Sequence, residues 1–115
     1  MEKIEVVAGL SALAQDTRLD IFRLLVQSGK EGRPVGHIGQ MLGLPSATLS
    51  FHLNQLKHAG LVTFRREGRS LIYSVNFAAM NGLMAFLTAN CCGGNVGECG
   101  IEAAACDPSG RGRIS

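Results

Sequence analysis

The sequence predicts a mainly α-helical fold with a single β-hairpin, and three observations lead to this class. Up to residue 90, apolar side chains recur three and four positions apart, which is the spacing of helices with one buried face. Two strand-like segments, LVTFRR and SLIYSV, occur in residues 61–75, and the short glycine-containing loop EGR joins them. At 115 residues, the chain has the length of one small domain.

The first two helices are predicted in the first quarter of the chain. Residues 3–14 are expected to form the first, because apolar residues recur there at helical spacing: Val6, Leu10 and Leu13. The second is expected to begin at Asp16, a residue type that commonly caps helix N-termini. Its predicted inward side chains are Leu19, Phe22, Leu25 and Val26. Gly29 ends this helix, and the segment GKEGRP is expected to be a loop.

A short third helix and a longer fourth helix follow, with a tight turn between them. The apolar residues that mark the third helix are Val35, Ile38 and Leu42. Gly43 closes it at a position where a positive φ is needed. Ser46 is expected to cap the fourth helix, ATLSFHLNQLKHA, and Gly60 to end it. The buried stripe of the fourth helix is Leu49, Leu53 and Leu56.

A last helix is predicted in residues 77–89, after the hairpin. Its apolar side chains are spaced three, four and three apart, as in the seam of a coiled coil: Phe77, Met80, Met84 and Leu87. The chain is 46% apolar, which is high for its length. This excess indicates a surface that pairs with a second copy of the chain.

Two short helices joined by a tight turn, followed by a basic hairpin, are the arrangement of a winged helix-turn-helix. The exposed side of the fourth helix carries small and amide-bearing side chains, which can bond base edges in a DNA major groove, and the hairpin arginines can lie over phosphates. The candidate DNA-binding residues are Ser46, Thr48, Ser50, Phe51, His52, Asn54, Gln55, Lys57, Arg65, Arg66 and Arg69. An ordinary solvent-exposed face explains such a helix by itself, but the turn and the basic hairpin together favour DNA binding.

The composition of the chain changes after residue 90. Residues 1–90 are expected to form a winged helix-turn-helix domain for DNA binding and dimerisation. Residues 91–115 are rich in glycine and poor in apolar bulk, so we expect a flexible tail unless a ligand organises it. All four cysteines of the chain lie in this tail: Cys91, Cys92, Cys99 and Cys106.

Three ordered segments, ALAQDTRLDIFRLL, LPSATLSFHLNQLKHAGLV and REGRSLIYSV, resemble the ArsR/SmtB family of metal-responsive transcriptional repressors. The resemblance covers roughly residues 10–90. It implies a dimeric winged helix that binds double-stranded operator DNA, with residues 46–58 as the recognition helix and residues 65–71 as the wing. It also implies a homodimer contact through residues 3–14 and 77–89, and a regulator in place of an enzyme.

The sequence departs from the usual sensing sites of that family. The family's best-known arsenic site places cysteines in the helix before the recognition helix, but the equivalent stretch here, RPVGHIGQ, contains none. Its zinc sites use Asp and His on the last helix, and residues 77–90 contain neither. The stretch NCCGGNVGEC resembles instead a branch of the family that senses arsenite through a C-terminal Cys-Cys pair and a later cysteine.

Thiolates in this pattern suit trivalent arsenic. As(III) is a soft, three-coordinate centre, and three thiolates give it a neutral complex that buries no net charge. We expect Cys91, Cys92 and Cys99 to be the ligands, with Cys106 as the alternative third. The expected inducer is As(III), with Sb(III) or a trivalent organoarsenical as alternatives, and no cofactor is expected to be needed for folding.

The cysteines of the tail also allow other interpretations. Four cysteines can hold zinc or cadmium, and neighbouring thiols can act as a redox switch, so a repressor of the same fold with either response is the main alternative. An enzyme that reduces arsenic is disfavoured, because the sequence has neither a glycine-rich anion loop nor a CxxC motif. Incidental cysteines are disfavoured because exposed thiols are a liability. The three histidines are not expected to be ligands.

No membrane segment is predicted. The charged residues Glu2, Lys3 and Glu5 interrupt any apolar run at the start, so a signal peptide is not expected. The longest apolar stretch, FAAMNGLMAFL, is far shorter than the ~20 residues that cross a bilayer. We therefore expect a cytoplasmic protein with no membrane partner, where thiols stay reduced.

Overall fold

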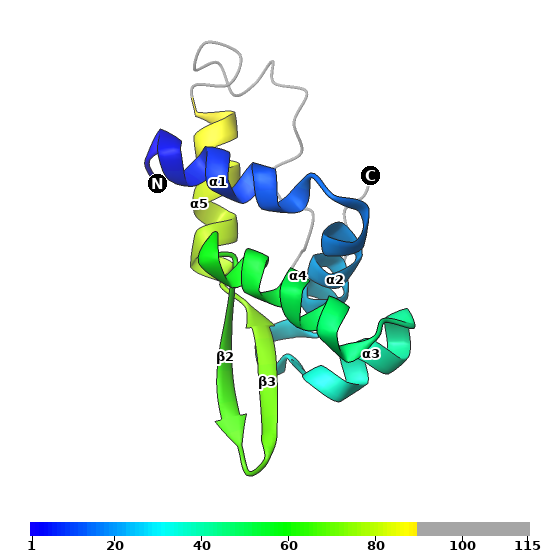
Figure 1. Ribbon diagram of the computed structural model, residues 1–115. Coiled ribbons are helices and arrows are strands. Elements are labelled where there is room, and N and C mark those ends of the chain that lie inside the picture. The colour runs from blue at the N-terminus through cyan, green and yellow to red at the C-terminus, as the bar shows by residue number, and fades with distance from the viewer. Residues whose placement is uncertain (90–115) are drawn as a thin grey trace, which may run out of the picture.

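The computed structural model describes residues 1–89 of the chain. This range contains a small antiparallel sheet, a short 3-10 helix and five α-helices (Figure 1). In chain order they are α1 (Lys3–Leu13), α2 (Asp16–Gln27), the 3-10 helix η1 (Gly29–Glu31), β1 (Arg33–Pro34), α3 (Val35–Leu42), α4 (Ser46–His58), β2 (Val62–Glu67), β3 (Ser70–Val75) and α5 (Phe77–Thr88). The hairpin of β2 and β3 projects from one end of the helical part, and α1 and α5 lie at the opposite end. The predicted fold class is confirmed.

The N-cap residues of α2 and α4 each lie one position before the predicted ones. Gln15, not Asp16, caps α2: its backbone is extended and its side-chain oxygen accepts a hydrogen bond from the Arg18 N–H at 2.9 Å. Asp16 lies in the first turn, where its negative charge complements the helix dipole. Pro45 occupies the cap of α4, because its fixed φ of −62° suits the extended conformation there, and Ser46 is the first helical residue.

The tight turn between α3 and α4 forms as predicted. Gly43 ends α3 with φ 65° and ψ 37°, a left-handed conformation that costs glycine little. The Leu44 N–H then donates to the Gly39 carbonyl at 3.0 Å, which closes the end of α3. This turn orients α4 relative to α3 in a helix-turn-helix pair.

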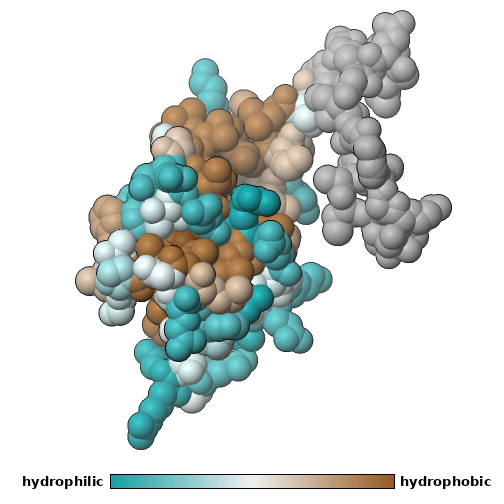
Figure 2. Space-filling view, turned by 90° about the vertical axis from the view of Figure 1, so that its right-hand side faces the viewer, coloured by the Kyte–Doolittle hydropathy of each residue, from teal (hydrophilic) through white to brown (hydrophobic). Residues whose placement is uncertain are grey.

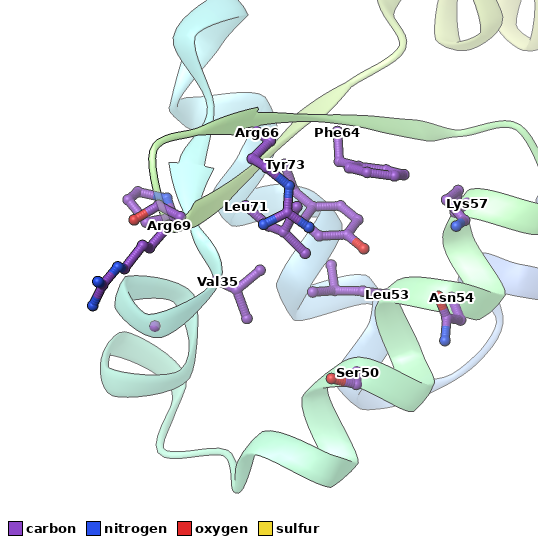
Figure 3. A pocket seen from close by; sticks show the side chains of 13 residues that line it. Val35, Ser50, Leu53, Asn54, Lys57, Phe64, Arg66, Arg69, Leu71 and Tyr73 are labelled. Atoms are coloured by element: carbon purple, nitrogen blue, oxygen red, sulfur yellow. The ribbon is translucent and has the colours of Figure 1, made fainter.

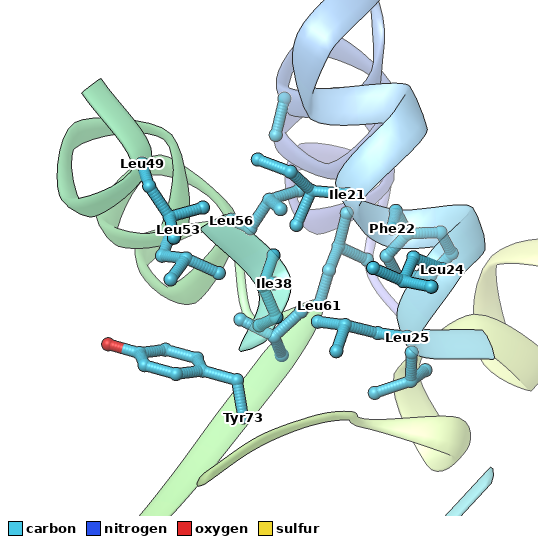
Figure 4. Packing of buried hydrophobic residues seen from close by; sticks show 13 residues of the cluster. Ile21, Phe22, Leu24, Leu25, Ile38, Leu49, Leu53, Leu56, Leu61 and Tyr73 are labelled. Carbon is cyan, nitrogen blue, oxygen red and sulfur yellow. The ribbon is translucent and has the colours of Figure 1, made fainter. Parts of the chain in front are cut away.

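The hydrophobic core lies where α2, α3 and α4 meet the sheet (Figure 4). The predicted leucine stripe of α4 is buried, and with it other large side chains are removed from solvent: Ile21, Leu25, Ile38, Leu49, Leu53, Leu56, Leu61 and Val62. The prediction for α2 is wrong at Leu19, which is 44% exposed. At about 100° per residue, Leu19 lies on the far side of the helix from Ile21, and Ile21 and Leu24 fill the core in its place.

The sheet has the order β1-β3-β2, with both pairs antiparallel. In the hairpin, Val62 pairs with Val75 and Glu67 with Ser70, so only two residues connect the strands. The segment predicted as a loop contributes the short strand β1, which pairs Arg33 with Tyr73. A strand of two residues is too short to show an alternating pattern, so the sequence could not indicate it.

The end of the molecule formed by α1 and α5 is rich in exposed apolar side chains (Figure 2). The two helices approach each other where Gly9 of α1 lies beside Leu83 of α5, and both of these residues are buried. Of the apolar residues at helical spacing in α1, Val6 is buried, whereas Leu10 is 41% exposed. The exposed apolar residues here, which we call the α1/α5 face, are Ile4, Val7, Leu10, Met84, Phe86 and Leu87.

None of the helices in residues 1–89 is both long enough and apolar enough to span a membrane.

Candidate nucleic-acid interface

Helix α4 buries one stripe and leaves the rest of its surface to solvent. Its core side is occupied by Leu49, His52, Leu53 and Leu56. The predicted site residues on its open side are exposed, with Lys57 half-buried at the edge: Ser46, Thr48, Ser50, Phe51, Asn54 and Gln55. This side faces away from the core and presents hydroxyl, amide and aromatic groups together.

His52 departs from the prediction, because its side chain is only 9% exposed and belongs to the interior. Its Nδ1 lies 3.1 Å from Nη1 of Arg18. Arginine can only donate, so Nδ1 accepts and the ring proton is on Nε2. Burial lowers the pKa of His52 below 6.5, and the charge of Arg18 lowers that pKa further. His52 therefore joins α4 to α2 as a neutral ring and is removed from the candidate contact residues.

The position of His52 could have been read from the helical period. It follows Leu49 by three residues and precedes Leu56 by four, so it lies in the buried leucine stripe. Its partner Arg18 carries no such signal, since the two residues are 34 positions apart. The Nε of Arg18 donates to the Ala12 carbonyl at 2.7 Å, which holds the guanidinium against the end of α1.

The arginines of the hairpin lie on two different faces. Arg65 donates from Nε to the Glu67 carboxylate at 2.8 Å and from Nη2 to the Glu31 carbonyl at 3.0 Å. Arg66, one residue on, points to the opposite face because side chains alternate along a strand. Arg69 lies in the connection between the strands, beside Gly68 with φ 61°. The structure thus brings Arg66 and Arg69 toward α4 and turns Arg65 away from it.

A groove of about 600 Å³ runs between the hairpin, α4 and the start of α3 (Figure 3). Its lining is Pro34, Val35, Gly36, Ser50, Leu53, Asn54, Lys57, Phe64, Arg66, Arg69, Ser70, Leu71 and Tyr73. Three of these carry a positive charge and none carries a negative one, so the groove attracts anions. Ser50 and Asn54 add hydrogen-bonding groups from α4 along the same side.

The aromatic floor of the groove was not foreseen from the sequence. The Phe64 ring lies 5.5 Å from that of Tyr73, and the Lys57 Nζ lies 4.9 Å from the centre of the Phe64 ring. This cation–π contact holds the ammonium group at the edge of the groove. Burial raises the pKa of the Tyr73 phenol above its ordinary value. The alternation of Phe64 and Arg66 was the signal that both share one strand face.

The predicted thiol ligands Cys91, Cys92, Cys99 and Cys106 lie outside the described residues. Within residues 1–89, no three side chains of His, Cys, Asp or Glu come together as a metal site. Helix α5 ends at Thr88, three positions before the first cysteine.

Comparison with known proteins agrees with the fold. A helix-turn-helix domain family model matches residues 13–64. Nodulation protein NolR of Rhizobium meliloti is 36% identical over 88 residues, which are 76% of this chain and 70% of NolR. The solution structure of the homodimeric winged helix-turn-helix DNA-binding domain of Mb0332 from Mycobacterium bovis, associated with the ArsR family, is similar with 32% identity and a TM-score of 0.61. This match covers 73% of this chain and 76% of that domain.

A third relative bears on regulation. A protein of Halobacterium salinarum assigned as the arsenical resistance operon repressor ArsR is 41% identical over 63 residues, or 55% of this chain and 48% of that protein. The fold and the relatives together define a DNA-binding transcriptional regulator of the winged helix-turn-helix class, not an enzyme. Within that class, the chain belongs to the ArsR family.

Proposed function

We propose that this chain is a homodimeric repressor that binds operator DNA and releases it when trivalent arsenic binds to cysteines after α5. The observation that carries the DNA-binding part is the cationic groove beside the exposed side of α4. The arsenic part rests on the cysteine pattern of the sequence and on the similarity to the assigned arsenical resistance repressor.

The groove and α4 suit a DNA major groove. With α4 inserted there, Ser50 and Asn54 would meet base edges, and asparagine pairs well with adenine. Lys57, Arg66 and Arg69 would lie over phosphates, where they supply affinity that does not depend on sequence. Arg65 would contribute less, because Glu67 and the Glu31 carbonyl already occupy two of its five donors and hold it on the other face of the hairpin.

The α1/α5 face is the proposed contact between two copies. Ile4 is 79% exposed and Leu87 58% exposed, which is unfavourable for a monomer because apolar surface is costly in water. The related Mycobacterium bovis domain is a homodimer. A two-fold pair would place two α4 helices one DNA turn apart on a pseudo-palindromic operator.

The proposed inducer site is Cys91, Cys92 and Cys99, with Cys106 as the alternative third ligand. The sites follow α5 directly in sequence, so arsenic bound there would act next to the dimer contact and change the relative placement of the two α4 helices. Antimony and trivalent organoarsenicals have matching thiol chemistry. Such a regulator would work in the cytoplasm, where DNA is present and thiols are reduced.

The energy required for this response is attainable. To move the dimer from 99% bound to 99% released, the inducer must favour the released state by about 5.5 kcal/mol. Two equivalent sites share this demand, so each supplies about half of it.

The experiment that tests the proposal begins with selection of an operator from a random DNA pool by the full-length protein. Binding of the selected DNA is then measured by fluorescence anisotropy with arsenite, zinc, cadmium or hydrogen peroxide added separately. Release by arsenite at concentrations where the other three have little effect supports the proposal. Release by zinc, cadmium or peroxide alone assigns the chain to the alternative class of sensor, and failure to select any DNA contradicts the repressor.

A further inference from the structure

Phe51 is the one large apolar side chain on the exposed side of α4, and it does not pack in the hydrophobic core. The residue is 56% exposed, while the core positions of the same helix are nearly fully buried. Its neighbours on that side, including Ser50 and Asn54, are polar and exposed. A protein-binding surface normally needs a contiguous apolar patch, and Phe51 does not lie in one on α4.

The ring of Phe51 is held in place from behind. It meets the His52 ring edge-on, with centroids 5.3 Å apart and planes at 64°. His52 is fixed in turn by Arg18, whose Nε is bonded to the Ala12 carbonyl. The ring that projects from α4 is therefore braced by a chain of contacts that leads into the interior. A braced side chain loses little freedom on binding, so its contact energy is largely retained.

We propose that Phe51 recognises the C5-methyl group of a thymine in each operator half-site, an inference that rests on the proposed DNA-binding function. The thymine methyl is the one apolar group that base pairs of ordinary composition present in the major groove. Against any other base edge, the ring would displace water from a donor or acceptor and give nothing back.

The position of Phe51 on α4 fits this role. It lies in the second turn of the helix, and the N-terminal part of a recognition helix is the part that reaches base edges. The cations of the groove lie on the side of α4 that carries Lys57. With those cations on the phosphates, the side of α4 that carries Phe51 would face the base pairs.

The expected size of the effect follows from the burial of one methyl group, which corresponds to about a fourfold change in affinity. A dimer that reads one thymine in each half-site would lose about 15-fold when both methyl groups are absent.

The test replaces each thymine of the selected operator in turn with deoxyuridine, which lacks only the methyl group. Synthetic DNA carries no methylated cytosine, so thymine is the sole source of this group. Binding of the wild-type protein is compared with that of Phe51→Ala and Phe51→Leu. Arg69→Ala serves as the control, because loss of a phosphate contact should weaken binding to all operators equally.

The wild type, Phe51→Leu and Arg69→Ala are expected to lose about fourfold at one thymine per half-site. Phe51→Ala lacks the ring in both subunits, so it is expected to bind all operators about 15-fold more weakly than the wild type binds the unmodified operator, with no further loss when a thymine is replaced. The inference is overturned if Phe51→Ala keeps the same uracil penalty, or if no thymine is sensitive in the wild type. In both of those cases the protein still binds its operator, whereas failure to bind any DNA rejects the proposed function itself.

Discussion

Arg65 and Arg66 are adjacent residues of the same type, but they lie on opposite faces of the hairpin and should differ in their contribution to DNA binding. Arg66→Ala should weaken DNA binding and reduce its dependence on salt, whereas Arg65→Ala should change both little. Arg66 lines the cationic groove with Lys57 and Arg69, but Arg65 is bonded to Glu67 and to the Glu31 carbonyl on the other face. The exposed Arg65–Glu67 ion pair, with side chains 45% and 60% exposed, contributes little to stability, so its loss should leave the fold intact.

The magnitude follows from counterion release. Three groove cations in each of two subunits should neutralise six phosphates, for a slope of log affinity against log salt of about −5. Removal of Arg66 from both subunits should reduce the size of this slope by about 1.8. Between 50 and 200 mM salt, the variant should therefore lose about tenfold less affinity than the wild type does.

The assay is a salt series of anisotropy titrations on one selected operator, with thermal unfolding of each variant as a check of folding. An equal reduction of the slope in Arg65→Ala and Arg66→Ala would contradict this prediction, because the two arginines would then contact DNA equally. The prediction is also refuted if Arg66→Ala leaves the slope unchanged.

Three further predictions concern the pH dependence, the dimer and the sheet. The pKa of His52 is lowered on folding, so the folded chain binds fewer protons than the unfolded chain and its free energy of unfolding should fall as the pH drops through 6.5. His52→Gln should remove this part of the fall in urea denaturation at pH 7.5 and 5.5, and an equally steep fall in the variant would contradict the assignment. Leu87→Glu should give a monomer in sedimentation experiments, whereas Met41→Glu, which is similarly exposed on α3, should stay dimeric; a dimeric Leu87→Glu would place the contact elsewhere. Gly32→Ala should lower the free energy of unfolding by about 2 kcal/mol or more, because φ is 73° and a Cβ would collide with the Tyr73 carbonyl oxygen. Gly29→Ala should lower the free energy of unfolding less, because a Cβ there would enter open space. Equal losses in the two variants would rule out the collision.

Much of the fold could be predicted because its elements are long enough to show a period. The stripe of Leu49, Leu53 and Leu56 located the buried side of α4, and Gly43 marked the end of α3 through its need for a positive φ. Helical spacing gave the wrong buried face in part of α2, where Leu19 was predicted to be buried but is exposed. Helical spacing defines a face, but the packing partners decide which of two adjacent faces is buried.

The candidate DNA-binding site could be predicted in composition but not in arrangement. The run of arginines in the hairpin indicated positive charge, and strand alternation separates Arg65 from Arg66, but only the structure shows that the Glu67 carboxylate and the Glu31 carbonyl bind Arg65. The contact of Lys57 with Phe64 joins α4 to β2, and no local sequence pattern predicts it. Such contacts depend on how separate segments meet in space. The roles of Cys91, Cys92 and Cys99 remain predictions from the sequence.

The most direct test of the account is arsenite-driven release of the full-length protein from its selected operator, measured by anisotropy for the wild type and for Cys92→Ser. The wild type is expected to dissociate as arsenite is added, while Cys92→Ser should bind the operator equally well and stay bound. The proposed mechanism would be contradicted if the wild type stayed bound to its operator at saturating arsenite. It would also be contradicted if Cys92→Ser released DNA as the wild type does.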